Sequence, residues 1–289
     1  MKILITGCNG QVGNELMKLC TLNHHEVFGY DLPDLDICNL SEILNKVEKI
    51  MPDFVVNCAA YTAVDKAESD KTLAFAVNES GPANLAEATA QYNIPFIHIS
   101  TDYVFNGEKK ESYLETDETC PTSVYGISKL AGEKAVQEKN KNHIIIRTSW
   151  VFSPFGHNFV KTMLKLSQER ETLKVVADQK GCPTSARSIA NVILEIMKKG
   201  INGKTGLYHF SQQPPSSWHE LASEVVQQAR QSGFMVKTRE VLPITTEEYP
   251  TPAKRPENSV LNCEKVYKTF NINPSFWKES IKETLSVLH

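Results

Sequence analysis

The stretch Ile5-Thr-Gly-Cys-Asn-Gly-Gln-Val-Gly13 decides the fold, because its three glycines separate an apolar segment from an amphipathic one. Residues 1–6 have the composition of a buried strand, and the apolar residues from Gln11 to Leu22 recur at helical spacing. Glycines at such a turn let the backbone approach a pyrophosphate, whose charge a helix N-terminus stabilises. The stretch predicts the start of a dinucleotide-binding βαβ unit, with a plain tight turn as the alternative.

Strand-like and helix-like segments alternate from this turn as far as Thr148. Such alternation predicts an α/β fold with a Rossmann-type, doubly wound parallel sheet. The regularity fades afterwards, which predicts a smaller C-terminal α/β lobe that binds the substrate. We therefore expect a dinucleotide-binding domain and a substrate-binding lobe with these bounds: 1–149, completed by about 186–210, for the first, and 150–185 with 211–289 for the second.

The composition narrows the functional classes. A length of 289 residues suffices for one large α/β core and a smaller lobe, and a net charge of -3 gives no electrostatic case for nucleic acid or an anionic membrane. The N-terminus begins with a strand rather than an apolar signal region, so we expect a cytoplasmic protein. The seven cysteines form no C-x-x-C pair and are expected to be free thiols rather than disulfides or zinc ligands.

Tyr125 and Lys129 lie four residues apart in Val124-Tyr-Gly-Ile-Ser-Lys129, which stacks them on one face of a predicted helix. An ammonium beside a phenol favours the phenolate, so we expect the pKa of Tyr125 to fall from about 10 toward the working pH. Tyr-x-x-x-Lys alone is a weak pattern, because surface helices often contain it by chance. The pattern indicates a catalytic pair here because the chain also contains the glycine turn and the segment around Thr101.

Ser100-Thr-Asp102 ends a predicted strand, where ligands gather in open parallel sheets. The Thr101 hydroxyl could donate to the same carbonyl oxygen that Tyr125 protonates. The alternative is a polar cluster that only ends the strand in a turn. Taken together, the residues predict hydride transfer to or from a nicotinamide, with Thr101, Tyr125 and Lys129 as the catalytic set.

Asp31 closes the second predicted strand, 18 residues beyond Gly13, near the spacing expected for a carboxylate on the adenosine ribose. A carboxylate there disfavours a 2′-phosphate, and no Arg or Lys follows within ten residues. This indicates NADH over NADPH, although a loop aspartate in a turn with Pro33 would look the same. The cofactor preference stays open.

Four other features are candidates for ligand contact. Ala59 and Ala60 are small enough for a nicotinamide ribose to lie close, and Trp150 is a candidate for stacking on a sugar ring or for the core. Arg255 is a candidate for clamping a substrate diphosphate, with a solvated surface pair as the alternative. The long polar loop 106–121 is of a kind that is often functional.

The chain resembles the dTDP-4-dehydrorhamnose reductase family of the extended short-chain dehydrogenase/reductases along nearly its whole length. The most specific matching stretches are Ala59-Ala-Tyr-Thr-Ala-Val-Asp-Lys-Ala-Glu68, Arg147-Thr-Ser-Trp150 and Asp178-Gln-Lys-Gly-Cys-Pro-Thr184, beside the glycine turn and the Tyr/Lys pair. The resemblance implies reduction of the C4 keto group of dTDP-4-dehydro-L-rhamnose, with NADPH or NADH as the donor and a dTDP-sugar as the substrate.

The resemblance and the residue patterns together give the predicted site. The cofactor-binding set comprises the glycine turn, the end of the second strand and the residues around the Tyr/Lys pair, namely Gly7, Asn9, Gly10, Gln11, Val12, Gly13, Asp31, Asp36, Ile37, Ala59, Ala60, Tyr61, Asn78, Tyr125 and Lys129. The substrate-binding set comprises Val64, Thr101, Asp102, Tyr103, Trp150 and Arg255.

Some members of the family bind magnesium through carboxylates that bridge a dimer. Glu15 matches one such position, but Arg187 stands where those members have a glutamate, and the C-terminal helix offers only Glu279 and Glu283. An arginine in a metal shell is unfavourable, so we expect no metal, and a monomer or weak homodimer.

Two other functions use the same scaffold. A sugar-nucleotide epimerase or dehydratase would hold an oxidised cofactor tightly and consume none. A non-catalytic regulatory subunit would resemble that of methionine adenosyltransferase, since fold does not fix function.

Overall fold

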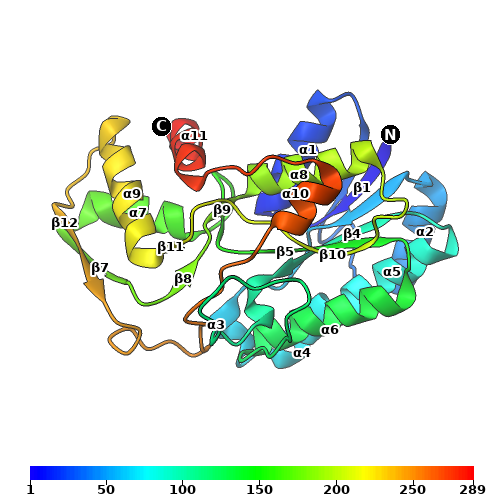
Figure 1. Cartoon of the computed structure of the whole chain (residues 1–289). Coiled ribbons are helices and arrows are strands. Elements are labelled where there is room, and N and C mark those ends of the chain that lie inside the picture. Colours follow the sequence, from blue (N-terminus) through cyan, green and yellow to red (C-terminus); the bar gives the residue numbers. More distant parts are fainter.

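The computed structural model describes residues 1–289, whose central feature is a six-stranded sheet. Every pair of neighbouring strands in it is parallel, which confirms the predicted doubly wound sheet (Figure 1). In spatial order the strands are β10 (Gly206–His209), β5 (His143–Thr148), β4 (Phe96–Thr101), β3 (Phe54–Asn57), β1 (Lys2–Thr6) and β2 (Glu26–Tyr30).

Helices cover both faces of the sheet (Figure 1). One face carries α1 (Gln11–Leu22), α8 (Ala186–Lys199) and α10 (Glu264–Phe270), and the other carries α2 (Leu40–Ile50), α5 (Gly81–Gln91) and α6 (Val124–Lys139). The alternation of side chains along each strand requires both layers. Ile3 and Ile5 of β1 enter the first core, whereas Leu4 between them enters the second.

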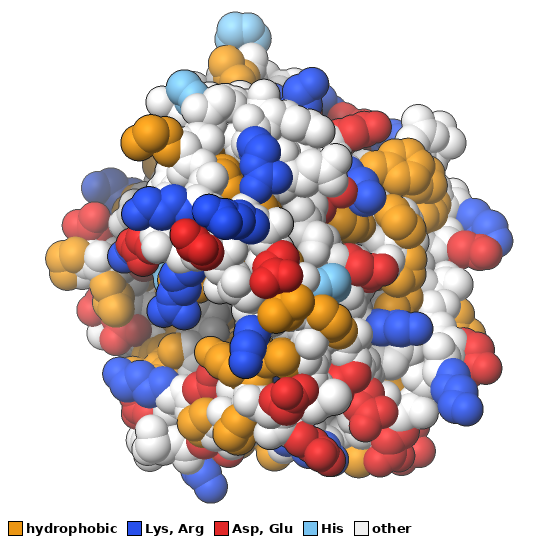
Figure 2. Space-filling view, turned by 90° about the vertical axis from the view of Figure 1, so that its left-hand side faces the viewer, with side chains coloured by type: hydrophobic (Ala, Val, Ile, Leu, Met, Phe, Trp, Pro, Cys, Tyr) orange, Lys and Arg blue, Asp and Glu red, His pale blue; other side chains and the backbone are white.

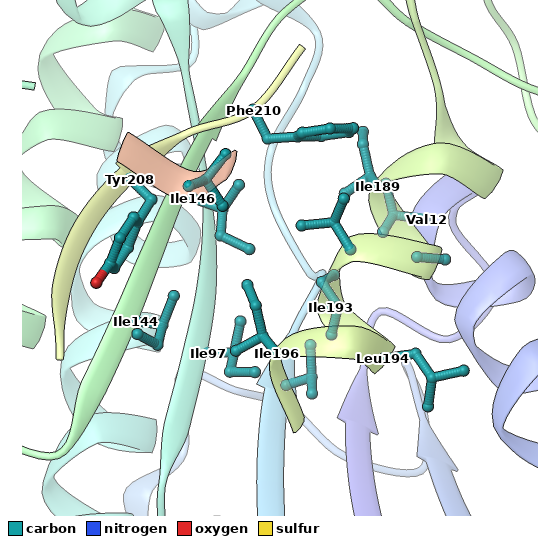
Figure 3. Packing of buried hydrophobic residues seen from close by; sticks show 14 of the residues in the cluster. Val12, Ile97, Ile144, Ile146, Ile189, Ile193, Leu194, Ile196, Tyr208 and Phe210 are labelled. Atoms are coloured by element: carbon teal, nitrogen blue, oxygen red, sulfur yellow. The ribbon is translucent and has the colours of Figure 1, made fainter. Parts of the chain in front are cut away.

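The first core shows how the sequence fixes this layering. Ile189, Ile193 and Ile196 recur at helical spacing along α8 and meet the strand residues Ile97 and Ile144 beneath them (Figure 3). All five are fully buried. Burial of each such side chain contributes about 1.5–3 kcal/mol. This contact therefore holds α8 on the sheet, although more than 30 residues separate α8 from β5, the preceding strand of that sheet.

The long helix expected before β4 is interrupted in the structure. It consists of α4 (Lys71–Phe75), the π-helical turn η1 (Ala76–Ser80) and α5, preceded by the short α3 (Val64–Ala67). Pro82 explains the change of helix type, because proline has no N–H for the α-helical bond to the Asn78 carbonyl four residues earlier. The wider turn aims Asn78 at the loop after β3.

A second lobe packs around its own core at the carboxyl edge of the sheet. Its main elements are α7 (Phe159–Glu169), α9 (Trp218–Gln231) and α11 (Trp277–Leu288), with the parallel pair β7 (Thr172–Val176) and β12 (Glu240–Ile244). Two short ladders connect it to the sheet unit: β6 (Val151–Phe152) with β9 (Thr184–Ser185), and β8 (Lys180–Gly181) with β11 (Ser216–Ser217). Its outer face mixes basic, acidic and hydrophobic side chains (Figure 2).

The structure differs from the predicted boundaries in one segment. Leu261, Cys263, Val266 and Phe270 lie in the core of the sheet unit, although residues 211–289 were assigned to the substrate lobe. Here α10 covers the end of α8 and β10, and its apolar face needs that surface for burial. No separate signal in the sequence marks this return, because a seven-residue helix has too few turns for a clear apolar period.

The polar loop 106–121 does not reach the ligand cleft that is described below. Tyr113 pairs with Leu261, and the Glu115 carboxylate accepts a hydrogen bond from the backbone N–H of His209 at 2.9 Å. The loop therefore fastens the return segment to the sheet and lines no part of the cleft, so a functional role for it stays a prediction. All seven cysteines are unpaired, and no helix is long and apolar enough to cross a membrane.

A substitution of Gly132 tests how closely α6 packs against η1. A Cβ at this position would lie 2.0 Å from the Asn78 carbonyl oxygen. We therefore expect Gly132→Ala to lower the free energy of unfolding by about 1–3 kcal/mol in spite of its better helix propensity. The exposed Gln137→Ala on the same helix is the control and should be nearly neutral in denaturant unfolding. Equal stability of the two variants would contradict the close packing.

Candidate active site

A cleft of about 1260 Å³ lies between the carboxyl edge of the sheet and the second lobe. Nearly all residues of the predicted site line it, namely Gly7, Gly10, Gln11, Val12, Asp31, Asp36, Ile37, Ala59, Ala60, Tyr61, Val64, Thr101, Asp102, Tyr103, Tyr125, Lys129, Trp150 and Arg255. Asn9, Gly13 and Asn78 do not. The sheet order places β1 beside β3 at the point where the strand order reverses, which is where ligands bind in such sheets.

The glycine turn forms the floor of the cleft beside this switch point. Gly7 has φ +69°, and a Cβ there would lie 2.4 Å from the Ala59 backbone nitrogen. At Gly13 a Cβ would lie 2.1 Å from the Gly7 carbonyl oxygen, so this glycine serves the tight turn rather than a ligand. No side chain caps the N-terminus of α1. Its first N–H groups therefore stay available for an anion, which fits a dinucleotide pyrophosphate.

Asp31 lies at the end of the cleft next to β2, where its carboxylate already holds the glycine turn. It accepts hydrogen bonds from the backbone N–H of Asn9 at 3.2 Å and of Leu32 at 3.0 Å. Asn9 thus contributes its backbone rather than a side chain to this end. The cations that line the cleft are Lys129, Arg170, Lys174 and Arg255, and none of them belongs to the segment 30–37 at this end.

Asn78 is fully buried behind the cleft wall, where its side chain forms hydrogen bonds with the backbone of Tyr61. Its amide oxygen accepts a hydrogen bond from the Tyr61 N–H at 2.9 Å, and its amide nitrogen donates to the Tyr61 carbonyl at 3.1 Å. The same nitrogen lies 3.1 Å from the Ser128 hydroxyl of α6. Asn78 was predicted among the cofactor-binding residues, whereas its side chain bonds the loop after β3 to α6 from behind the cleft wall.

Thr101 and Asp102 end β4 as a bonded pair. The Thr101 hydroxyl donates to the Asp102 carboxylate at 3.0 Å and accepts from the Tyr103 N–H at 3.2 Å. The second carboxylate oxygen of Asp102 is buried without a hydrogen-bond partner, and burial raises the pKa of Asp102 to about 6. To donate to a substrate, the Thr101 hydroxyl must turn away from Asp102.

Tyr125 and Lys129 share the face of α6 that meets β4, as predicted, but their electrostatics differ from the prediction. Burial raises the pKa of Tyr125 to about 12, against the effect of the Thr101 hydroxyl. Burial also lowers the pKa of Lys129 to about 8. The Lys129 ammonium donates to the Ile99 carbonyl at 2.7 Å. The expected lowering of the tyrosine pKa is therefore wrong in this structure, because desolvation outweighs the hydrogen bond of Thr101 and the charge of Asp102 raises the pKa further.

The Trp150 ring is covered on one face by another indole. It stacks on Trp218 with ring centroids 3.5 Å apart and an interplanar angle of 7°. A Cβ at Gly181 would lie 2.4, 2.6 and 2.7 Å from three ring atoms of Trp150, so only a glycine fits beside the ring. The face that Trp218 covers is lost to a ligand, and stacking of a sugar on Trp150 stays a prediction for the rest of the ring.

Arg255 is tied across the cleft to the other lobe. Its guanidinium donates to both carboxylate oxygens of Asp65, at 3.1 and 2.8 Å, and also bonds Thr251. The bond from Arg255 is the main cause that lowers the pKa of Asp65. The fork predicted for a substrate diphosphate is thus occupied by a carboxylate, in an ion pair whose two side chains are 23% and 40% exposed.

Sequence reasoning missed the contacts that join the two lobes at the glycine turn. The Gln11 side-chain oxygen accepts hydrogen bonds from the Asn158 amide at 2.9 Å and the Ser153 hydroxyl at 3.2 Å. Trp218 was missed as well, although it follows a serine cap and lines the cleft with its indole bonded to Gln179 at 3.1 Å. The one available signal was an aromatic residue directly after the serine cap of a helix.

The position that matches the magnesium ligand of some relatives does not fit a metal ion. Glu15 is buried on α1, and burial raises the pKa of its carboxyl, while the charge of Arg187 opposes this rise. A cation held at this position would compete with Arg187. No group of three or more His, Cys, Asp or Glu side chains comes together.

Comparison with known proteins places the chain among reductases of sugar nucleotides. The family described as RmlD substrate binding domain matches residues 1–289. A dTDP-4-dehydrorhamnose reductase from Aggregatibacter actinomycetemcomitans is 43% identical over 285 residues, which cover 97% of each chain.

Two solved structures are similar over the whole length. A dTDP-4-dehydrorhamnose reductase from Clostridium acetobutylicum has a TM-score of 0.92 and 43% identity, covering 100% of this chain and 99% of its own. A dTDP-4-dehydrorhamnose reductase from Bacillus anthracis, solved in complex with NADP, has a TM-score of 0.92 and 35% identity over 99% of both chains.

The stacked indoles give a spectroscopic test of the site. Two parallel indoles in contact couple their transitions, so we expect an exciton couplet in the far-ultraviolet circular dichroism spectrum that Trp218→Leu abolishes. Trp277→Phe is the control, because Trp277 lies in the core of the second lobe and forms no such stack. A couplet that survives in Trp218→Leu would contradict the pairing.

Proposed function

The chain belongs to the RmlD substrate binding domain family, and we propose that it reduces the C4 keto group of dTDP-4-dehydro-L-rhamnose to give dTDP-L-rhamnose, with NADPH or NADH as donor. The observation that carries the proposal is the convergence of the glycine turn, Thr101, Tyr125 and Lys129 on one cleft. Reductases of this name match the chain over nearly all of both sequences.

The residues of the cleft suit the protonation of a ketone oxygen. Because burial raises the pKa of Tyr125 to about 12, its phenol carries its proton at neutral pH. An alkoxide is a much stronger base than a phenolate, so the proton passes from Tyr125 to the forming alkoxide. The Thr101 hydroxyl, once turned from Asp102, is in position to donate to the same oxygen.

Lys129 and the glycine turn hold the dinucleotide in this proposal. The ammonium uses one of its three donors on the Ile99 carbonyl, which leaves two for a nicotinamide ribose. A bound reduced nicotinamide supplies the hydride. The free N–H groups at the start of α1 bind the pyrophosphate, and Asp31 meets the adenosine ribose.

The substrate lies toward the second lobe. Val64, Asp102, Tyr103 and Trp150 line the part of the cleft that we assign to the sugar. Magnesium has no part in the proposed reaction, because the charge of Arg187 already acts on Glu15. The assignment of the two lobes to cofactor and substrate, and a monomeric or weakly dimeric state in the cytoplasm, are part of the proposal.

Product identification separates this function from its rivals. Incubation with dTDP-4-dehydro-L-rhamnose and each reduced cofactor should give dTDP-L-rhamnose by NMR and consume one cofactor per product. An epimerase or dehydratase would give product without net consumption of reduced cofactor. A regulatory subunit would show no reductase rate and would co-purify with a partner enzyme in stoichiometric amount.

Tyr125→Phe tests the proton donor. Removal of the phenol hydroxyl should lower kcat by about 100-fold or more, while the affinity for reduced cofactor, measured by its fluorescence, stays close to normal. Tyr92→Phe, at the end of α5 and away from the cleft, is the matched control and should keep the full rate. A near-normal kcat in Tyr125→Phe would refute the assigned role.

Asp31→Asn tests the cofactor preference. Loss of the carboxylate charge removes repulsion of a 2′-phosphate, so the ratio of kcat/KM for NADPH to that for NADH should rise about tenfold, or about 1.4 kcal/mol. Asp34→Asn removes a charge from the same exposed turn outside the cleft and should leave the ratio unchanged. An unchanged ratio in Asp31→Asn would show that Asp31 does not meet the adenosine ribose.

A further inference from the structure

A buried ion pair lies one helical turn beyond Lys129 and belongs to none of the predicted sites. Glu133 of α6 and Arg147 of β5 form two parallel hydrogen bonds, Nε to Oε1 at 2.8 Å and Nη2 to Oε2 at 2.7 Å. Glu133 is 1% exposed and Arg147 is 3% exposed. Two ions lose their hydration at such a depth, and only a complete set of bonds compensates for that loss. The geometry of the pair is therefore closely defined.

The pair joins the elements that carry the catalytic set. Besides Arg147, the Glu133 carboxylate accepts a hydrogen bond from the hydroxyl of Ser100, the residue that precedes Thr101 on β4. Arg147 lies with its guanidinium 5.1 Å from the ring centre of Phe105. Glu133 thus bonds β4 and β5 at once, while its own helix presents Tyr125 and Lys129 to the cleft.

Glu133 also lies on the sheet-facing side of α6 with Tyr125 and Lys129, at successive intervals of four residues. Lys129 is 2% exposed and its one hydrogen bond is to the Ile99 carbonyl of β4, which is neutral. A buried ammonium in a neutral surrounding tends to lose its proton. The nearest full negative charge on the same helix face is Glu133.

The titratable groups around Lys129 come from four elements: Tyr125 and Glu133 of α6, His98 of β4 with Asp102 just beyond it, Cys58 after β3, and Arg147 of β5. Burial lowers the pKa of His98 far below its usual value and raises that of Cys58 to about 12, so both are neutral at pH 7. Burial lowers the pKa of Lys129 to about 8, and the charge of Glu133 is the largest effect that opposes it. Arg147 is held by Glu133 itself.

We propose that Glu133 is a positioning residue for the reaction, which bonds α6 to β4 and β5 through Arg147 and Ser100 and keeps Lys129 charged where the reduced dinucleotide binds. The inference rests on the proposed function, because it assigns Lys129 to the dinucleotide. Glu133 acts through Lys129 and touches neither substrate nor cofactor.

The test is the pH dependence of NADH binding to Glu133→Gln, followed by the fluorescence of the bound dinucleotide. NADH is chosen because it lacks a 2′-phosphate that titrates near neutrality. The Lys129 ammonium supports binding below its pKa, so affinity falls as the pH rises through about 8. Without the Glu133 charge the pKa of Lys129 is lower, and the loss of affinity should move about one pH unit toward acid.

Ser100→Ala is the matched control. It removes a hydrogen bond from the same carboxylate and keeps the charge, so the midpoint should not move. If Glu133→Gln leaves Arg147 unpaired and does not fold, the double variant Glu133→Gln with Arg147→Met removes both ions. It should still show an acid shift, smaller than that of the single variant because the repulsive charge of Arg147 is removed as well. An acid shift in the folded variant that Ser100→Ala lacks supports the proposal.

Two negative results have different meanings. Normal NADH binding by the unmodified protein, together with an unmoved midpoint in the folded Glu133 variant, overturns the role of Glu133 alone. Absence of NADH and NADPH binding by the unmodified protein at every pH overturns the proposed function and this inference with it.

Discussion

The parallel pairing of β1 with β3 is the constraint on which the cleft depends. Residues Ile3–Thr6 pair with Phe54–Asn57, and this register brings the turn after β1 into contact with the chain after β3. Gly7 lies so close to Ala59 that no side chain fits between them. The crossovers from these two strands run to opposite sides, which opens the crevice between them. A dinucleotide site follows from the sheet order and needs only small residues at two turns.

Burial then decides the charge of each group in the cleft. It raises the pKa of Tyr125 and Asp102 and lowers that of Lys129, so each group is moved toward its neutral form. The raised pKa of Tyr125 suits a reductase, since a proton donor has to carry its proton when the substrate binds. The lowered pKa of Lys129 does not suit a lysine whose ammonium must bind a ribose. Lys129 is therefore the group that needs a counter-charge from the surrounding structure.

The sequence was sufficient to predict the sheet and the residues around the cleft. The glycine turn and the Tyr/Lys pair can be recognised there from their spacing within a short segment. It was insufficient for partners that are distant along the chain. Trp150 stacks on Trp218, and Arg255 bonds Asp65, 190 residues earlier in the chain. Each of these contacts changes what the residue can do, since a covered indole face and an occupied guanidinium fork are lost to a ligand. Spacing within a motif carries no information on such pairs.

Pairs that are distant along the chain also hold the two lobes together across the cleft. Gln11 bonds Asn158 at the glycine turn, and Asp65 bonds Arg255 at the opposite wall, so each lobe is held to the other on both sides of the cleft. Gln11 opens the helix whose N-terminus faces the bound pyrophosphate in our proposal, and Asn158 caps α7 in the second lobe. The Gln11–Asn158 hydrogen bond therefore links the helix start that we assign to the pyrophosphate directly to the lobe that we assign to the sugar.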